Sequence, residues 1–293
     1  MAGVGTLKLI DQDTVELNNL HRQPLYTIKD IRKPKVEAAA KRLKEINPST
    51  KVVPVAENLR ESNVDESLAD VDCVVDGLDN MATRYVVNSY CVRSKMPYVF
   101  GGAIGLEGNL SVFVHPETPC LECVLPGLDD RGLPTCETRG VLGATTGIIG
   151  TLQAVETIKI LARMGDPLKG RLLLMDLYVG DIRTIQVNRR DDCRVCSKPQ
   201  ITARTVQEKL TWLCGRETAN VNPPSPMTIN LRRAATRIGR KHKIHLRSES
   251  VLVFDYDGHE VSLFPKGRAL IKNIQDEEGA LRVYRKLVKE LAR

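Results

Sequence analysis

Two pairs of cysteines, each separated by two residues, are the clearest chemical signal in the sequence. They are Cys120-Leu-Glu-Cys123 and Cys193-Arg-Val-Cys196. Four thiolates are the donor set of a closed tetrahedral Zn²⁺ site, so the pairs predict structural zinc. The sequence between them is far longer than in a zinc finger, so the metal would join distant parts of one fold. Four reduced core thiols are the alternative; a redox pair is disfavoured because neither motif opens a helix after a strand.

A run of polar residues at 11–26, DQDTVELNNLHRQPLY, follows the strand-like stretch TLKLI. Asp11 stands where the second strand of a nucleotide-binding unit places an acid for ribose hydroxyls. Arg22 offers two donors to phosphate oxygens, and Lys35 offers a point charge at the start of a predicted helix, whose N-terminus also attracts anions. These residues predict half of a nucleotide site, and ordinary surface side chains are the alternative for each. The glycine-rich phosphate loop, expected about 20 residues earlier, would precede Met1.

Two further residues could do chemistry. Asp79, in DGLDN, lies just beyond the third predicted strand, where open α/β sheets bind ligands. Its carboxylate could hold Mg²⁺ against phosphates, or it could simply be a loop residue before the next helix. Cys136, in PTCETRG, is a candidate nucleophile because the nearby Arg139 would favour its thiolate. Taken alone, Cys136 is better interpreted as a spare loop cysteine.

The elements that would position these residues alternate between strands and helices. The first hundred residues predict strands over 7–10, 51–56, 71–76 and 97–101, and helices over 35–46 and 83–94. Near-continuous apolar strands separated by helices predict a parallel sheet covered on both faces. An antiparallel strand at 109–115, a helix at 143–164 and strands at 172–175 and 182–187 follow. Gly147 and Gly150 in that helix indicate that something packs closely against it.

The fold class is therefore α/β: a Rossmann-like, mostly parallel sheet flanked by helices over residues 1–198, without the first strand and glycine-rich loop. Residues 199–293 predict a second, small and basic α+β domain. Its predicted elements are a short helix capped by Thr205 and Glu208, a helix over 229–238, a hairpin over 251–264 and a helix over 276–291.

The net charge of +7 arises in the second domain, because residues 201–293 carry 18 Lys and Arg against 10 Asp and Glu. Residues 232–247 hold seven cations and no acid. A solvated face is one explanation, and a surface for an acidic protein or nucleic acid is the other. Aromatic side chains are almost absent there, which argues against single-strand binding.

Eight cysteines without a secretion signal indicate thiols or metal rather than disulfides. No run of about 18 apolar residues predicts a membrane span. The N-terminus lacks the basic and apolar regions of a signal peptide. We therefore predict a cytoplasmic protein that does not contact membranes.

Together these motifs resemble the MoeB/ThiF family of ubiquitin-activating-like adenylyltransferases. The matching stretches are AGVGTLKLIDQDTVELNNLHRQPLY, RKPKVEAA, DGLDNMATRYVVN, GGAIGLEGNLSVF, CLEC, TCETRGVLG and CRVC. The resemblance runs from Ala2 to about Lys198 and depends on several unusual motifs in the same order. The stretch LFPKGRALIKNIQDEEGALRVYRKL resembles a small domain appended to some members.

The resemblance implies that the C-terminal glycine of a ubiquitin-like or sulfur-carrier protein ending in Gly-Gly is activated with Mg-ATP. The products are an acyl-adenylate and pyrophosphate, and some members then pass the carrier to a thiol or to sulfur. The implied roles are ribose binding by Asp11, phosphate binding by Asn19, Arg22, Gln23 and Lys35, Mg²⁺ binding by Asp79, a reactive thiol at Cys136 and structural Zn²⁺ at Cys120, Cys123, Cys193 and Cys196. A homodimer is also implied.

One departure from the family pattern bears on activity. The glycine-rich loop, the first strand and an upstream Arg have no match, because GVG at 3–5 corresponds to the link after the first helix. We expect either a chain read from a late Met or a fragment, or else a degenerate relative that docks the carrier without turnover. Arg139 also stands where many relatives carry a small residue. A nucleotide-dependent oxidoreductase and a tRNA-modifying relative are further alternatives.

Overall fold

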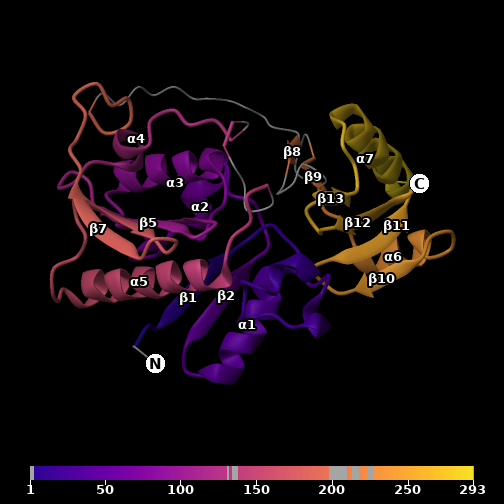
Figure 1. The fold of residues 1–293 in the computed structure, drawn as a ribbon. Helices are drawn as coiled ribbons and strands as arrows, with labels where there is room; N and C mark the ends of the chain where they lie inside the picture. Colours follow the sequence, from indigo (N-terminus) through magenta and orange to yellow (C-terminus); the bar gives the residue numbers. More distant parts are fainter. Residues whose placement is uncertain are drawn as a thin grey trace. The chain divides into compact units, whose positions relative to one another are not determined.

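The computed structural model describes residues 3–130, 132–133, 138–197, 210–212, 218–223 and 227–292, which form two compact units (Figure 1). Unit 1 comprises residues 1–11, 19–24 and 43–202, and unit 2 comprises 12–18, 25–42 and 203–293. Unit 2 thus combines the C-terminal third with two stretches near the N-terminus. The domain boundary proposed at residue 198 stays a prediction.

The strands of unit 1 form two sheets. Strand β1 (Thr6–Ile10) pairs in parallel with β2 (Lys51–Val55). The second sheet has the order β3-β4-β5-β6-β7, with bounds Val74–Val75, Tyr98–Ile104, Glu107–Phe113, Arg171–Asp176 and Asp181–Gln186. Strands β3 and β4 are parallel, and the later pairs are antiparallel. The parallel pairing predicted for the early strands and the antiparallel strand predicted near residue 109 are both present.

Helices cover both faces of the five-stranded sheet, as predicted (Figure 1). Tyr98 and Phe100 of β4 pack in one core with residues of α3 (Met81–Ser94), whereas Val99 packs on the other side with Leu152 of α5 (Gly143–Ala162). This alternation follows from the opposite directions of successive side chains in a strand. The α/β class predicted from the sequence is confirmed.

Shorter helical elements complete the connections. They are η1 (Leu17–Asn19), η2 (Ile28–Asp30), α1 (Lys35–Ile46), α2 (Val64–Ser67) and α4 (Leu121–Val124). The strand predicted over 71–76 is reduced to two residues, because only Val74 and Val75 pair with β4. In the described part of the chain, no helix is both long and apolar enough to cross a membrane.

The C-terminal part of unit 2 is a six-stranded antiparallel sheet of order β10-β11-β12-β13-β9-β8. Its strands are β8 (Leu210–Trp212), β9 (Thr218–Val221), β10 (Ile244–Arg247), β11 (Leu252–Tyr256), β12 (His259–Leu263) and β13 (Ala269–Lys272). Helices α6 (Leu231–Ile238) and α7 (Glu277–Ala292) share one apolar core with it. The predicted hairpin is present, and Asp257 and Gly258 at its turn both have positive φ. Thr205 and Glu208, predicted to cap a short helix, lie outside the described residues.

Candidate functional site

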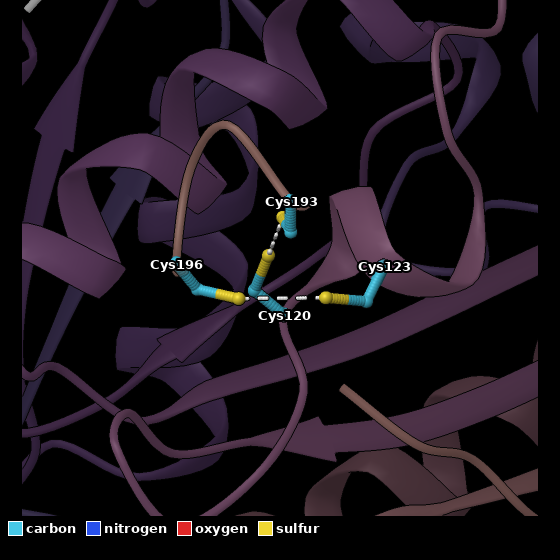
Figure 2. A group of neighbouring side chains, drawn as sticks. All are labelled: Cys120, Cys123, Cys193 and Cys196. Carbon is cyan, nitrogen blue, oxygen red and sulfur yellow. Dashed lines mark hydrogen bonds between the residues drawn. The ribbon is translucent and has the colours of Figure 1, made fainter. Parts of the chain in front are cut away.

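The four paired cysteines meet in one buried cluster of unit 1 (Figure 2). All four Sγ atoms lie within 4.8 Å of one another. Cys120 Sγ is 3.7 Å from Cys193 Sγ, and Cys123 Sγ is 3.4 Å from Cys196 Sγ. These separations exceed a disulfide bond of about 2.05 Å and approach the ~3.8 Å between sulfurs at the corners of a tetrahedron with Zn–S bonds of about 2.3 Å. The residues therefore fit Zn²⁺, although the bound ion stays a prediction.

Two short loops hold the cysteines in place. The first loop includes α4 and is fixed to α3 because Asn88 Oδ1 accepts a hydrogen bond of 2.9 Å from Leu121 N–H. The second loop follows β7. Arg194 of the second loop donates from Nε and Nη2 to Glu122 Oε1 of the first, at 3.0 and 2.8 Å. This ion pair joins the two loops beside the sulfur cluster.

The protonation of the cluster depends on burial and on nearby N–H groups. Burial raises the pKa of Cys120, with the neighbouring thiols adding to the effect, and burial raises the pKa of Cys196 to about 11. Burial also opposes ionisation of Cys193, but backbone N–H groups of Cys196 and Val195 lower its pKa. A divalent cation would let all four thiols ionise together, because its charge offsets their mutual repulsion.

Asp11 and Asp79 follow the ends of two strands in unit 1. Asp11 comes directly after β1, and its N–H donates to Val55 O at 3.2 Å. Asp79 is exposed in the loop between β3 and α3. Ile10 packs against the same apolar core as Leu78 and Met81. The neighbours of the two acids thus share one core, as expected for a strand-end site.

Three of the four residues predicted to bind phosphates lie in a tight turn that begins at Asn19. The buried Asn19 accepts hydrogen bonds at its carbonyl from Arg22 N–H (3.1 Å) and Gln23 N–H (3.0 Å). A Cβ at Gly143 would lie 2.4 Å from His21 O, so only glycine lets the start of α5 approach this turn. Gln23 Oε1 is buried without a hydrogen-bond partner in the described structure.

Lys35 belongs to unit 2 and begins α1. It is only 8% exposed, and its Nζ donates to Asp13 Oδ2 at 3.0 Å. Its N–H also donates to Asp13 O at 2.9 Å. Asp13 was not singled out from the sequence, although it stands in the same polar run as Asp11. Its carboxylate holds the Lys35 ammonium, which a phosphate would have to share.

A second acid of the DGLDN loop forms a buried network that the sequence reasoning missed. The Asp76 carboxylate, fully buried, accepts from Arg84 Nε (3.0 Å), Tyr98 OH (2.7 Å) and Leu78 N–H (2.7 Å). Arg84 Nη2 donates in turn to Leu78 O and Gly101 O. Burial and the adjacent Asp76 raise the pKa of Tyr98, so its hydroxyl stays a donor. The network fixes the backbone of the loop that carries Asp79.

Cys136, the predicted reactive thiol, lies outside the described residues. Asp130, which precedes it in the chain, accepts hydrogen bonds from Met81 N–H and Ala82 N–H at the start of α3, at 2.6 and 3.0 Å. After it, Arg139 forms an exposed ion pair with Glu107. The role of Cys136 therefore stays a prediction.

The sheet, with its strand-end acids and cysteine cluster, has the architecture of a Rossmann-like α/β fold. The model of the ThiF family matches residues 1–195, and the chain belongs to that family, which confirms the resemblance seen in the motifs. It is 42% identical over 196 residues to adenylyltransferase and sulfurtransferase MOCS3 of Arabidopsis thaliana, covering 66% of this chain and 42% of that protein. The chain thus spans less than half of that relative's length.

Two prokaryotic relatives are similar. The sulfur carrier protein adenylyltransferase of Thermus thermophilus is 40% identical over 201 residues, covering 67% of this chain and 74% of that protein. The SAMP-activating enzyme E1 of Haloferax volcanii is 39% identical over 197 residues, with coverages of 67% and 73%. Among solved structures, E. coli MccB with ATP is similar with a TM-score of 0.59 at 25% identity, covering 66% of this chain and 60% of that chain.

Proposed function

We propose that this chain adenylates the C-terminal carboxylate of a ubiquitin-like or sulfur-carrier protein ending in Gly-Gly. The observation that carries the proposal is the position of Asp11 and Asp79 after the ends of β1 and β3, beside one apolar core. Ligands of open α/β sheets bind at such strand ends. Relatives named as adenylyltransferases or as an activating enzyme support the reaction type.

The reaction joins a carboxylate oxygen of the carrier to the α-phosphorus of ATP and releases pyrophosphate. The attacking group is already ionised at neutral pH, because a terminal carboxyl has a pKa of about 3.5, so no general base is needed. The main obstacle is repulsion between the carboxylate and the triphosphate. Arg22 and Lys35 offset it by donating to phosphate oxygens, and Asp11 holds the ribose. Mg²⁺ held by Asp79 would neutralise phosphate charge.

The cysteine cluster serves the fold in this proposal. Four protein thiolates fill a tetrahedral zinc site and leave no position for substrate, which is the arrangement of structural zinc. The cluster joins the α4 loop to the loop after β7, so metal binding would stabilise unit 1. It takes no part in adenylation.

We also propose that the enzyme is a homodimer that covers an apolar face of α5. Ile148 and Val155 are exposed there, and the space where Gly147 and Gly150 would carry a Cβ is open within the described structure. The close neighbour predicted for these glycines is thus not supplied by the described part of the chain. A second copy would supply it, because apolar side chains exposed on one helix favour association.

A carrier-docking module without turnover is the second candidate. Gly3 and Gly5 lead into β1 rather than into a helix, so they cannot cradle phosphates at a helix N-terminus. In the described ranges no other glycine-rich loop joins a strand to a helix. Carrier docking without turnover is therefore the candidate against which catalysis is tested.

ATP–pyrophosphate exchange separates the two candidates. The assay uses a recombinant ubiquitin-fold carrier ending in Gly-Gly, the same carrier without Gly-Gly as control, and both this chain and a version extended upstream in frame. Exchange by either chain that requires both the Gly-Gly end of the carrier and Mg²⁺ supports the adenylation proposal. Carrier binding without exchange in both chains would contradict it and support docking.

A further inference from the structure

One face of the C-terminal sheet in unit 2 carries Asn220 and Lys272, whose side chains contact the stretch 12–18. The opposite face carries the apolar core with α6 and α7. The stretch 12–18 is short but important in the chain, because it joins Asp11 to the turn that begins at Asn19. The residues that flank this stretch, Asp11 and Asn19, are both predicted nucleotide contacts.

Two buried side chains, one in β9 and one directly before β13, hold Gln12, the residue after Asp11. Arg268 Nη1 donates to Gln12 O at 2.8 Å, and Asn220 Nδ2 donates to Gln12 Oε1 at 3.0 Å. Arg268 is 4% exposed and Asn220 is 0% exposed. The guanidinium of Arg268 lies 3.6 Å from the centre of the Phe264 ring, which fixes its plane. Both the main chain and the side chain of Gln12 are thus held.

A chain of charges holds the other end of the stretch. Lys272 Nζ of β13 lies 2.6 Å from Glu16 Oε1 and 3.2 Å from Glu260 Oε1. Glu260 Oε2 in turn accepts a hydrogen bond of 2.8 Å from Arg32 Nε. All four side chains are partly shielded from solvent, which strengthens their attraction relative to exposed pairs. Lys272 thus links stretch 12–18, through Glu260 and Arg32, to stretch 25–42. The second stretch includes Lys35 at the start of α1.

We propose that the C-terminal sheet positions the nucleotide-binding segment, with Arg268, Asn220 and Lys272 as positioning residues that set the affinity for ATP. This inference rests on the proposed adenylation. A segment already held in its bound geometry loses less conformational freedom when the nucleotide binds. Loosening it should weaken ATP binding and leave carrier binding unchanged. If the sheet only stabilised the fold, substitutions in it would lower the free energy of unfolding. They would then not affect ATP binding and carrier binding differently.

Substitution at Lys272 tests the proposal, because Lys272→Met keeps the aliphatic stem and removes the charge. Lys272→Arg retains the charge, and Lys286→Met removes an exposed ion pair with Asp257 in the same unit. We expect Lys272→Met to raise the KM for ATP about tenfold in exchange assays, with the KM for the carrier unchanged. Deuterium uptake by peptides covering residues 12–18 should also become faster. Lys272→Arg and Lys286→Met should change neither quantity.

Glu16→Gln provides a second test, because it removes the partner of Lys272 without altering the sheet, and it should have the same effects. Deuterium uptake needs no catalysis, so it remains informative if neither chain length supports exchange and the adenylation proposal fails. Faster uptake at residues 12–18 would then still support positioning, and unchanged uptake would overturn it. In an active chain, an unchanged KM for ATP, or equal increases in both KM values, would also overturn it.

Discussion

At the scale of single residues, two acids three positions apart have opposite surroundings. Asp76 is fully buried and holds Arg84 and Tyr98, whereas Asp79 is exposed and accepts a hydrogen bond from Asn80 Nδ2. A buried carboxylate with three donors serves the structure, because breaking such a pair leaves an unpaired charge. An exposed carboxylate beyond a strand end contributes little to folding and can hold a cation.

Substitution of these two acids should therefore separate activity from stability. We expect Asp79→Asn to lower carrier-dependent exchange about a hundredfold while the melting temperature stays unchanged. Asp76→Asn should lower the free energy of unfolding by about 3 kcal/mol, because Arg84 loses its buried counter-charge. Exchange rates and urea unfolding of the two variants measure these effects. Normal exchange by Asp79→Asn would exclude it as the Mg²⁺ ligand.

The cysteine cluster makes a separate prediction about metal content. Purified wild-type protein should contain one zinc per chain, and Cys193→Ser should contain almost none and melt at a lower temperature. Loss of one of four ligands removes much of the large free energy of a structural zinc site. Elemental analysis and thermal melting measure this. Cys73→Ser, outside the cluster, is the control, and full zinc in Cys193→Ser would contradict the site.

At the scale of elements, the sequence predicted what depends on local pattern. The bounds of α1 agree with the prediction to the residue, because its apolar positions repeat with helical spacing. The long helix α5 begins as predicted and ends two residues early, where Arg163 takes a left-handed conformation. The metal cluster was predictable because the spacing of its cysteines is itself local.

Contacts between residues distant in sequence were not predictable in this way. The bond from Tyr98 to Asp76 spans 22 residues, and that from Arg268 to Gln12 spans 256. No periodicity marks such partners, because each depends on how whole elements meet. Part of the basic run at 232–247 has a similar explanation: Arg237 donates to Glu290 O and Leu291 O at the end of α7. The charge of Arg237 therefore caps the C-terminal end of α7. Nucleic acid as a partner of the basic run stays a prediction.

The charged chain on the C-terminal sheet predicts a pH dependence. Burial opposes ionisation of Glu260, but the hydrogen bond from Arg32 and the charge of Lys272 lower its pKa below the ordinary value of 4.5. The ionised form is thus favoured in the folded state. Its stabilising contribution, about 1 kcal/mol, is complete above the unfolded pKa and is lost as pH falls through the lower folded pKa.

Urea unfolding at pH 7, 5, 4 and 3 would measure this contribution. Wild type should be more stable than Glu260→Gln at pH 7, and the difference should shrink between pH 5 and 3. A difference that stays constant over this range would show that Glu260 ionises equally in the folded and unfolded states.

At the scale of the whole molecule, exposed apolar surface on α5 predicts self-association. A charge at Ile148 should prevent it, because a carboxylate cannot be buried unpaired at an interface. We expect Ile148→Glu to be monomeric by light scattering and to keep its secondary structure, whereas wild type is dimeric. Ile28→Glu, at an exposed apolar residue on η2, should leave the mass unchanged. A monomeric wild type would contradict the dimer.

The cysteine cluster also couples metal affinity to chain connectivity. Cys120 and Cys193 are 73 residues apart, so an ion held between the loops restricts the unfolded chain like a single cross-link, by about 4 kcal/mol. Binding and folding then share one thermodynamic cycle. For variants whose metal-free form is unfolded, each ~1.4 kcal/mol of added stability in unit 1 tightens apparent zinc binding about tenfold. For variants that fold without metal, added stability does not change the apparent zinc affinity. A zinc titration of such variants therefore shows whether unit 1 is already folded in the absence of the ion.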